Sequence, residues 1–294
     1  LPTAHWPASG LFYLWPLKAP LQGRAPPTCG HPIESRRSHS MEAPDILDAA
    51  RRQFQGDDYA VIPDIWTKDE VQQAIDALDA LVDDIRTHPL RWQEHVVWQS
   101  DVPERQLTGI PQALRAAAAT QPYIIGDLAS HSAVLRRMVL DERCRRIAEA
   151  LLDTERVCHF SNATIRAANG GCACNWHRDW PNSYCTTHTG RQLRILICLD
   201  GMHAERGATR VIHGSQHWND QQFNIWKQEE HPWDETGHAV TCSPGSVVVL
   251  GSRIVHGAGN NLSAVPRRNL ITQWGAREDL ICAQVFESVL GQTA

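Results

Sequence analysis

The sequence predicts a mainly β protein with flanking helices, built as a double-sheet jelly roll. Two observations favour this fold class. Before residue 153, apolar residues recur largely at helical spacing. From residue 156 onward, short apolar runs alternate with turn residues, as they do in an antiparallel β core. We therefore expect helices first and an antiparallel β core after them.

The length of 294 residues allows one large β domain or two smaller domains. Residues 1–40 contain seven prolines and show neither helical nor strand periodicity. We expect this segment to be a disordered tail or an appended extension. Residues 41–294 are expected to form a single domain.

The predicted elements before residue 156 are helices at 44–56 and 68–88, two further helices within 131–152, and a strand at 59–63. Thr67 and Glu70 have the spacing of a capping box, in which each side chain bonds the backbone N–H of the other residue. The second helix is therefore expected to begin here. Residues 90–125 show no clear pattern and are expected to be of mixed structure.

The strands predicted in the second half are 156–166, 192–199, 209–212, 246–250 and 269–274. Residues 214–241 form a long polar and aromatic insertion between two of these strands. Long connections of this kind are often lids or binding loops. The insertion is therefore a candidate cover for a binding site.

Composition excludes several classes of partner. The formal net charge is −5 and the isoelectric point is near 6.3, so the chain lacks the basic excess that nucleic-acid binding requires. No run approaches the roughly 18 apolar residues of a membrane-spanning helix. The nine cysteines form no Cys-x-x-Cys pairs, which favours reduced thiols in a cytoplasmic protein. We expect a small-molecule partner, and the sequence leaves the oligomeric state open.

Three residues have the pattern of a metal site. His177 and Asp179 are two apart, and His256 follows far downstream. Side chains at positions i and i+2 of a strand point to the same side, so His177 and Asp179 are expected to converge on one ion. Two imidazoles and one carboxylate occupy one face of an octahedral Fe(II) and leave the other face open. The same three ligands also suit zinc, so a zinc hydrolase is an alternative.

Several motifs follow one another in a fixed order: His177-Arg178-Asp179, then Gly-Ala-Thr-Arg-Val-Ile-His-Gly-Ser at 207–215, Pro-Gly-Ser-Val-Val-Val-Leu at 244–250, His-Gly-Ala-Gly-Asn-Asn at 256–261, and Arg267-Arg268. In this order they resemble the phytanoyl-CoA dioxygenase family of Fe(II)- and 2-oxoglutarate-dependent oxygenases. The resemblance covers about residues 55–275 and is strongest over 175–270.

The resemblance implies a cupin-like double-stranded β-helix with Fe(II) at one mouth, held by His177, Asp179 and His256. It implies 2-oxoglutarate and O₂ as cosubstrates, with ascorbate as the reductant in vitro. The family's 2-oxoglutarate arginine corresponds to Arg267, whose guanidinium suits a buried carboxylate. The adjacent Arg268 is the alternative. Strand alternation favours Arg267, which shares a face with Asn269, whereas Arg268 points to the other face.

Other residues are candidates for the pocket. Arg194 and Asn162 are expected to contact the cofactors, since both lie on strands that reach the site. Substrate contacts are expected from the following residues: Trp176, Trp180, Arg166 and His213. For both tryptophans, core packing is an equal alternative.

The sequence departs from the family pattern at two positions. Ala258 stands where many relatives have a serine, and His213 stands where many have a proline. Neither change removes a metal ligand. Halogenating relatives replace the carboxylate ligand with a small residue, and the presence of Asp179 argues against that reaction.

The resemblance implies hydroxylation of a C–H bond in a small organic molecule. The tryptophan-rich insertion favours an apolar or aromatic substrate, such as a secondary metabolite. Desaturation, epimerisation or cyclisation at the same iron is the first alternative. A jelly-roll binding protein without turnover is the second, and the zinc hydrolase is the third. The arginine eleven residues after His256 favours the oxygenase, because a zinc hydrolase would have no use for it.

Overall fold

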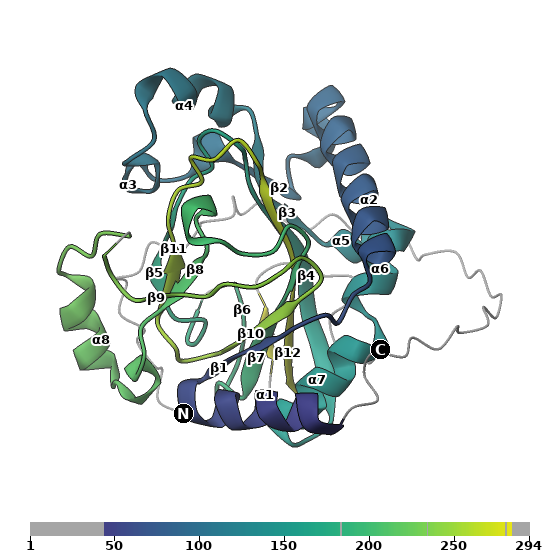
Figure 1. The fold of residues 1–294 in the computed structure, drawn as a ribbon, viewed down its shortest axis with the longest axis vertical. Coiled ribbons are helices and arrows are strands. Elements are labelled where there is room, and N and C mark those ends of the chain that lie inside the picture. The colour runs from purple at the N-terminus through teal and green to yellow at the C-terminus, as the bar shows by residue number, and fades with distance from the viewer. Residues whose placement is uncertain (1–43, 183, 234, 280, 284–294) are drawn as a thin grey trace, which may run out of the picture.

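A computed structural model describes residues 44–182, 184–233, 235–279 and 281–283, and the expected tail at 1–40 lies outside these ranges. A large and a small β-sheet form the centre, and helices surround them (Figure 1). The strands pair antiparallel throughout the described residues, which confirms the jelly-roll prediction. None of the described helices combines the length and the apolar character that crossing a bilayer requires.

The larger sheet has seven strands. Their order across the sheet is β1 (Tyr59–Ile62), β10 (Val247–Gly251), β7 (Gln192–Cys198), β12 (Arg267–Ala276), β4 (Arg156–Arg166), β3 (Pro122–Gly126) and β2 (Val96–Trp98). The second sheet has four strands, in the order β5 (Cys174–His177), β11 (His256–Ala258), β8 (Thr209–Val211) and β9 (His238–Ala239). Strands β13 (Ile281–Ala283) and β6 (Cys185–Thr187) form a separate pair.

The α-helices are α1 (Pro44–Asp57), α2 (Lys68–Thr87), α3 (Glu104–Leu107), α4 (Gln112–Ala119), α5 (Leu128–His131), α6 (Ala133–Val139), α7 (Glu142–Leu152) and α8 (Asp220–Lys227). The 3₁₀ turns are η2 (Pro89–Trp92), η3 (Gln99–Asp101), η4 (Ala204–Arg206) and η5 (Ser215–His217). Thr67 caps α2, and Glu70 returns the bond, so the predicted capping box is confirmed.

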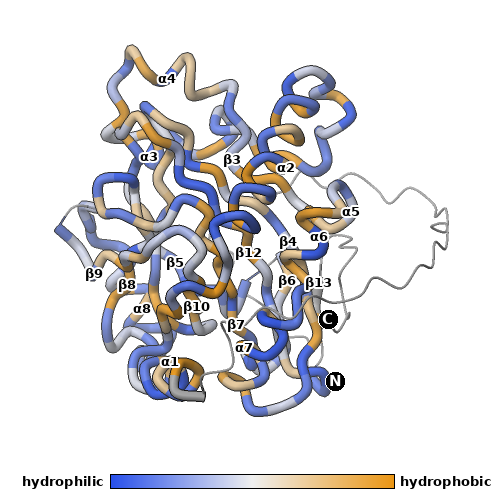
Figure 2. Tube along the Cα trace, turned by 45° about the vertical axis from the view of Figure 1, so that its right-hand side comes forward, coloured by the Kyte–Doolittle hydropathy of each residue, from blue (hydrophilic) through white to orange (hydrophobic). Residues whose placement is uncertain are grey.

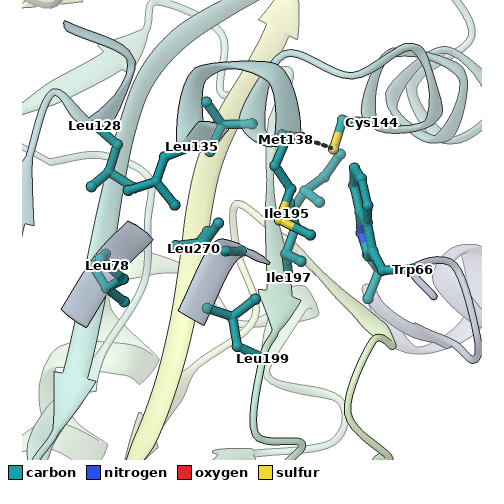
Figure 3. Close-up of a cluster of buried hydrophobic side chains, with 14 of the residues drawn as sticks. Trp66, Leu78, Leu128, Leu135, Met138, Cys144, Ile195, Ile197, Leu199 and Leu270 are labelled. Carbon is teal, nitrogen blue, oxygen red and sulfur yellow. Dashed lines mark hydrogen bonds between the residues drawn. The ribbon is translucent and has the colours of Figure 1, made fainter. Parts of the chain in front are cut away.

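The main hydrophobic core lies between the helices and the outer face of the larger sheet. Leu78 of α2 and Leu135 of α6 pack in the same cluster as Ile195, Ile197 and Leu270 of the sheet (Figure 3). The tube in Figure 2 alternates between hydrophobic and hydrophilic residues along α2, because only one face of this helix is buried. Burying each such side chain contributes about 1.5–3 kcal/mol.

The inner face of the same sheet has a different character. Alternate residues of β4, β7 and β12 turn away from the core and border a pocket between the two sheets, and among them are Asn162, Arg166, Arg194, Arg267 and Asn269. Strand alternation thus separates an apolar outer face, which stabilises the fold, from a polar inner face, which is available for chemistry.

Some elements differ from the sequence prediction. Residues 90–125 contain β2, β3, α3 and α4, all too short to produce a clear period. The predicted insertion contains η5, α8 and β9. Strand β5 ends at His177, so Asp179 lies in the bend after the strand and not on it.

The turn between β10 and β11 is fixed by a partly buried carboxylate, that of Asp58. Oδ2 of Asp58 accepts from the backbone N–H of Ile254 at 3.0 Å, and a Cβ at Gly251 would collide with this carboxylate. Oγ of Ser215 accepts from the next backbone N–H, that of Val255, at 2.8 Å. These two contacts hold the backbone that leads directly into His256.

Burial raises the pKa of Asp58 to about 6, against the lowering effect of the N–H groups of Ile254 and Arg253. Ionisation is therefore less favourable in the fold than in the unfolded chain, and this group makes the protein less stable as the pH rises from about 4 to about 6. We expect Asp58→Asn, which does not titrate, to gain stability relative to the wild type across this window, by up to about 3 kcal/mol. Urea denaturation at several pH values measures the difference, and a difference independent of pH would contradict the assignment.

Candidate metal centre

Three side chains from different parts of the chain meet in the pocket between the sheets. The candidate ligand atoms of His177, Asp179 and His256 all lie within 4.8 Å of one another. Nε2 of His177 is 3.6 Å from Oδ1 of Asp179, and Nε2 of His256 is 3.7 Å from Oδ2. His177 ends β5 and His256 begins β11, and the two residues are register partners in the smaller sheet. Register partners share a face, which explains why their rings lie 4.2 Å apart.

Backbone carbonyls orient both imidazoles. Nδ1 of His177 donates to the carbonyl of Asn175 at 2.8 Å, and Nδ1 of His256 donates to the carbonyl of Ile254 at 3.0 Å. Because a carbonyl can only accept, the proton lies on Nδ1 in each of these bonds. Nε2 then faces the shared space, and in the neutral form of each ring it offers a lone pair to a metal.

The protonation states of the histidines differ. Burial is the main cause that lowers the pKa of His256 to about 4, so this ring is neutral. Burial acts in the same direction on His177, but Cys174 and Asp179 outweigh it and raise its pKa to about 10. Since a metal binds only the neutral ring, binding at His177 releases a proton.

Asp179 is a buried carboxylate that pairs with one arginine but accepts no well-oriented hydrogen bond from the described residues. Its residue is 1% exposed, and neither side-chain oxygen has a well-oriented hydrogen bond within the described part of the chain. Burial acts to raise the pKa of Asp179, but the charges of Arg194 and His256 outweigh it and hold the pKa well below its usual range. Nη1 of Arg194 lies 2.8 Å from Oδ1. An ionised, poorly bonded carboxylate beside two available imidazole nitrogens fits a divalent cation.

Arg267 and Arg268 point to opposite faces of β12. Arg268 pairs with Asp200 and Asp79, both at 2.8 Å, so its charge is already balanced. Arg267 is 2% exposed, and no carboxylate of the described residues forms an ion pair with it. Its Nη1 meets the side-chain oxygen of Asn269 at 2.7 Å when that amide takes the orientation that satisfies both its ends. Burial, with help from Arg166, lowers the pKa of Arg267 to about 9, so an anion bound there would stabilise the charged form.

The cavity between the sheets has a volume of about 210 Å³ and brings together most of the residues predicted from the sequence. Arg194, Asn162 and Arg166 line it along with the three candidate ligands and Arg267. Arg166 is the register partner of Arg267 on the adjacent strand, and its guanidinium lies 5.7 Å from the ring of Tyr123.

Trp176 has its ring in an aromatic cluster formed with the insertion. It stacks on Trp233 with 5.0 Å between ring centroids and meets Trp226 edge-on. Its Nε1 donates to the carbonyl of His231 at 3.2 Å. Trp176 also lines the cavity, so it packs against the insertion and borders the space for a substrate.

The structure does not bring Trp180 or His213 to the pocket. Nε1 of Trp180 donates to the carbonyl of Thr187 at 2.9 Å, and Arg253 lies over its ring at 4.3 Å. His213 is half exposed, 3.8 Å from Asp57 and packed against Tyr59. Both residues are adjacent to functional motifs in the sequence, but their side chains turn away from the cavity.

Several pocket residues were missed at the sequence level. The cavity is also lined by Tyr123, Phe160, Tyr184, Arg105 and Lys227. Strand alternation from Asn162 identifies Phe160 two residues earlier on the same face. The other four lie on short elements or loops, where no periodicity marks the direction of a side chain.

Arg178, between two candidate ligands, holds the insertion in place. Its guanidinium donates to the carbonyls of Trp218 at 2.8 Å and Ser215 at 3.4 Å, and lies 4.5 Å from the ring of Phe223. Its residue is 3% exposed, so these contacts are shielded from water. The peptide that carries the candidate ligands is therefore tied directly to the insertion.

We expect His256→Ala to weaken binding of a divalent metal by at least about 100-fold, because it removes one of three ligands. Titration of the metal-free protein with Co(II), followed by visible absorption, measures the affinity. His213→Ala is the matched control, since this histidine is half exposed and outside the pocket. Equal affinity in the two variants would exclude His256 as a ligand.

Arg178→Ala is expected to loosen the insertion without unfolding the sheets. Hydrogen exchange of the backbone amides of residues 215–227 should accelerate, while exchange in β4 and β12 should stay the same. Unchanged exchange in the insertion would show that Arg178 does not hold it.

Known proteins with related sequences and structures fit this geometry. The chain matches the family model described as phytanoyl-CoA dioxygenase over residues 54–269. Ectoine dioxygenase from Sphingopyxis alaskensis is 24% identical over 268 residues, which cover 81% of this chain and 79% of that protein. Multifunctional dioxygenase prhA from Penicillium brasilianum is 28% identical over 135 residues, and the match spans only 44% of that relative's length and 44% of this chain.

Solved structures support the fold. EctD from S. alaskensis, with 2-oxoglutarate and 5-hydroxyectoine bound, has a TM-score of 0.62 at 21% identity and covers 87% of this chain and 90% of its own. The epimerase SnoN from nogalamycin biosynthesis has a TM-score of 0.60 at 18% identity, covering 80% and 84%. The carbocyclase SnoK from the same biosynthesis has a TM-score of 0.60 at 16% identity, covering 84% and 88%. The match to the family model, over most of the described chain, shows that the protein belongs to the phytanoyl-CoA dioxygenase family and is an Fe(II)- and 2-oxoglutarate-dependent dioxygenase.

Proposed function

We propose that this enzyme hydroxylates a C–H bond of a small organic molecule, in a reaction that consumes 2-oxoglutarate and O₂. One observation carries the proposal. A complete set of two histidines and one aspartate shares a pocket with Arg267, a buried guanidinium with no carboxylate partner among the described residues. The triad fits a metal, and the arginine fits a dicarboxylic cosubstrate. A zinc hydrolase or a binding protein would have no use for both.

The donor set fits Fe(II). Two neutral nitrogen donors and one carboxylate are the ligands of non-haem iron oxygenases, and they leave positions open on the metal. His177, Asp179 and His256 would hold the ion. When bound, Fe(II) and 2-oxoglutarate supply O₂ activation and C–H oxidation, with succinate and CO₂ as co-products.

The other predicted pocket residues would bind the cosubstrate, orient a metal ligand or enclose the substrate. Arg267 would bind the distal carboxylate of 2-oxoglutarate, and the side-chain amide of Asn162 lies in the same pocket to donate a hydrogen bond. Arg194 would orient Asp179 through the 2.8 Å contact with Oδ1. Arg166 and the aromatic residues of the pocket would enclose the substrate and exclude water.

Hydroxylation is favoured over halogenation because Asp179 keeps the third ligand position occupied. The second candidate is epimerisation, cyclisation or desaturation at the same site, since two structural relatives are named as an epimerase and a carbocyclase. Product mass separates hydroxylation from the alternatives. Hydroxylation adds one oxygen atom, epimerisation changes nothing, and cyclisation or desaturation removes two hydrogen atoms.

The test measures succinate after incubation with Fe(II), ascorbate, 2-oxoglutarate and a panel of small metabolites. We expect Asp179→Ala to abolish turnover. Arg267→Ala should raise the KM for 2-oxoglutarate roughly 100-fold, because removing a buried charge partner costs about 3 kcal/mol.

Arg268→Ala is the matched control, because its side chain lies on the opposite face and pairs with Asp200 and Asp79. It should leave the KM for 2-oxoglutarate unchanged and lower only stability. Equal effects of the two arginine substitutions would rule out the proposed cosubstrate site. Full succinate production by Asp179→Ala would rule out the proposed iron site.

A further inference from the structure

Two buried polar residues extend the contacts of Arg194 into the protein interior. Gln273 of β12 is the register partner of Arg194 on β7, so their side chains share the inner face of the larger sheet. His159 lies on β4, the next strand, and both Gln273 and His159 are fully buried. Figure 1 shows the three strands side by side. Buried polar side chains are unfavourable unless they form hydrogen bonds, so their partners indicate their role.

A β-bulge in β4 directs His159 toward this glutamine. Phe160 lines the pocket, and strand alternation would place Cys158 on the same side. Cys158 instead belongs to the hydrophobic core on the outer face. Phe160 and Cys158 are paired with consecutive residues of β12, so His159 between them is an extra residue. Bulges of this kind change the direction of a side chain and are common beside active sites.

Polar contacts connect His159 to the candidate ligand Asp179 in three steps. Nε2 of Gln273 lies 2.9 Å from Nδ1 of His159 and donates to the carbonyl of Cys185 at 3.1 Å. Nε of Arg194 donates to Oε1 of Gln273 at 3.4 Å. Nη1 of Arg194 lies 2.8 Å from Oδ1 of Asp179. Every link of this chain joins groups with complementary donors and acceptors.

Only one arrangement of protons satisfies these contacts. A carbonyl can only accept and a guanidinium can only donate, so the amide of Gln273 turns its nitrogen to Cys185 and its oxygen to Arg194. The same nitrogen donates to Nδ1 of His159, which must therefore carry no proton. Burial lowers the pKa of His159 to about 4, in agreement with a neutral ring. His159 thus holds the amide in the orientation that presents its oxygen to Arg194.

The imidazole of His159 is confined on its other side. A Cβ at Gly275, two residues after Gln273 on the same strand, would collide with the ring. Nε2 of His159 is buried and has no hydrogen-bond partner among the described residues. A buried polar atom in this state is unfavourable for folding, and an apolar side chain at this position would avoid it. The contact through Nδ1 is therefore what the imidazole contributes.

We propose that His159 and Gln273 are positioning residues of the metal centre. Together they hold the guanidinium of Arg194 against Oδ1 of Asp179, so that this carboxylate keeps the orientation in which it shares the site with the two histidine ligands. Neither residue lines the cavity, and both act through Arg194. This inference rests on the proposed function, because it takes Asp179 as a ligand of the same metal.

The test measures metal binding and not turnover. Metal-free protein is titrated with Co(II), and visible absorption follows the binding. We expect Gln273→Leu and His159→Leu each to weaken Co(II) binding by about tenfold, as is usual when a residue that orients a metal ligand is lost. His159→Asn should restore most of the affinity, because its side-chain oxygen replaces Nδ1 as the acceptor for Gln273.

Thr272→Val is the control for a general loss of stability. Thr272 is buried on the opposite face of β12, where its Oγ1 accepts from Nε1 of Trp274 at 2.9 Å. This substitution should lower the free energy of unfolding in urea and leave Co(II) affinity unchanged. A loss of affinity as large as that of Gln273→Leu would show that stability alone controls metal binding, which would overturn the proposal.

A double substitution tests whether Gln273 acts through Arg194. Arg194→Ala should itself weaken Co(II) binding, and adding Gln273→Leu should then weaken it no further. Fully additive losses, or equal losses in the Asn and Leu variants of His159, would contradict the proposal. A failure of the proposed iron site would look different, because Asp179→Ala would then bind Co(II) as tightly as the wild type.

Discussion

The site depends on one strand pairing. His177 and His256 come from segments separated by almost eighty residues, and the antiparallel pairing of β5 with β11 makes them register partners. A slip of one residue would turn one imidazole to the opposite face of the sheet. Asp58 and Ser215 accept hydrogen bonds from the backbone of the β10–β11 turn, and these bonds fix the position at which β11 begins.

The outer face of the larger sheet stabilises the fold, and its inner face carries the side chains of the site. On its outer face, Leu270 and Ile197 pack against helices in a continuous apolar core. On its inner face, the same strands carry Arg194, which pairs with Asp179, and Arg267, which pairs with no carboxylate of the described residues, into the pocket. Burying such charges is unfavourable for folding. The apolar burial on the outer face compensates for this, and the polar face is left ready for charged ligands.

The sequence predicted the part of the site that strand periodicity controls. The alternation of Arg267 and Arg268 distinguished a pocket side chain from one paired with Asp200, and the order of motifs identified the three candidate ligands. The sequence did not predict the direction of a side chain where tertiary packing determines it. Trp180 and His213 are close to the motifs in sequence, but a bend and a turn direct them elsewhere. Arg105 lies on a helix of only four residues, which produces no period to recognise.

The attachment of the insertion has a consequence for how this enzyme can diversify. Arg178 holds residues 215–218 through backbone carbonyls, which every amino acid supplies. Apart from Ser215, whose hydroxyl holds the backbone of Val255, side chains in this stretch can therefore be exchanged without loss of these bonds. The scaffold thus separates backbone anchoring from side chains that can vary, so new preferences for small molecules can arise beside an unchanged catalytic centre.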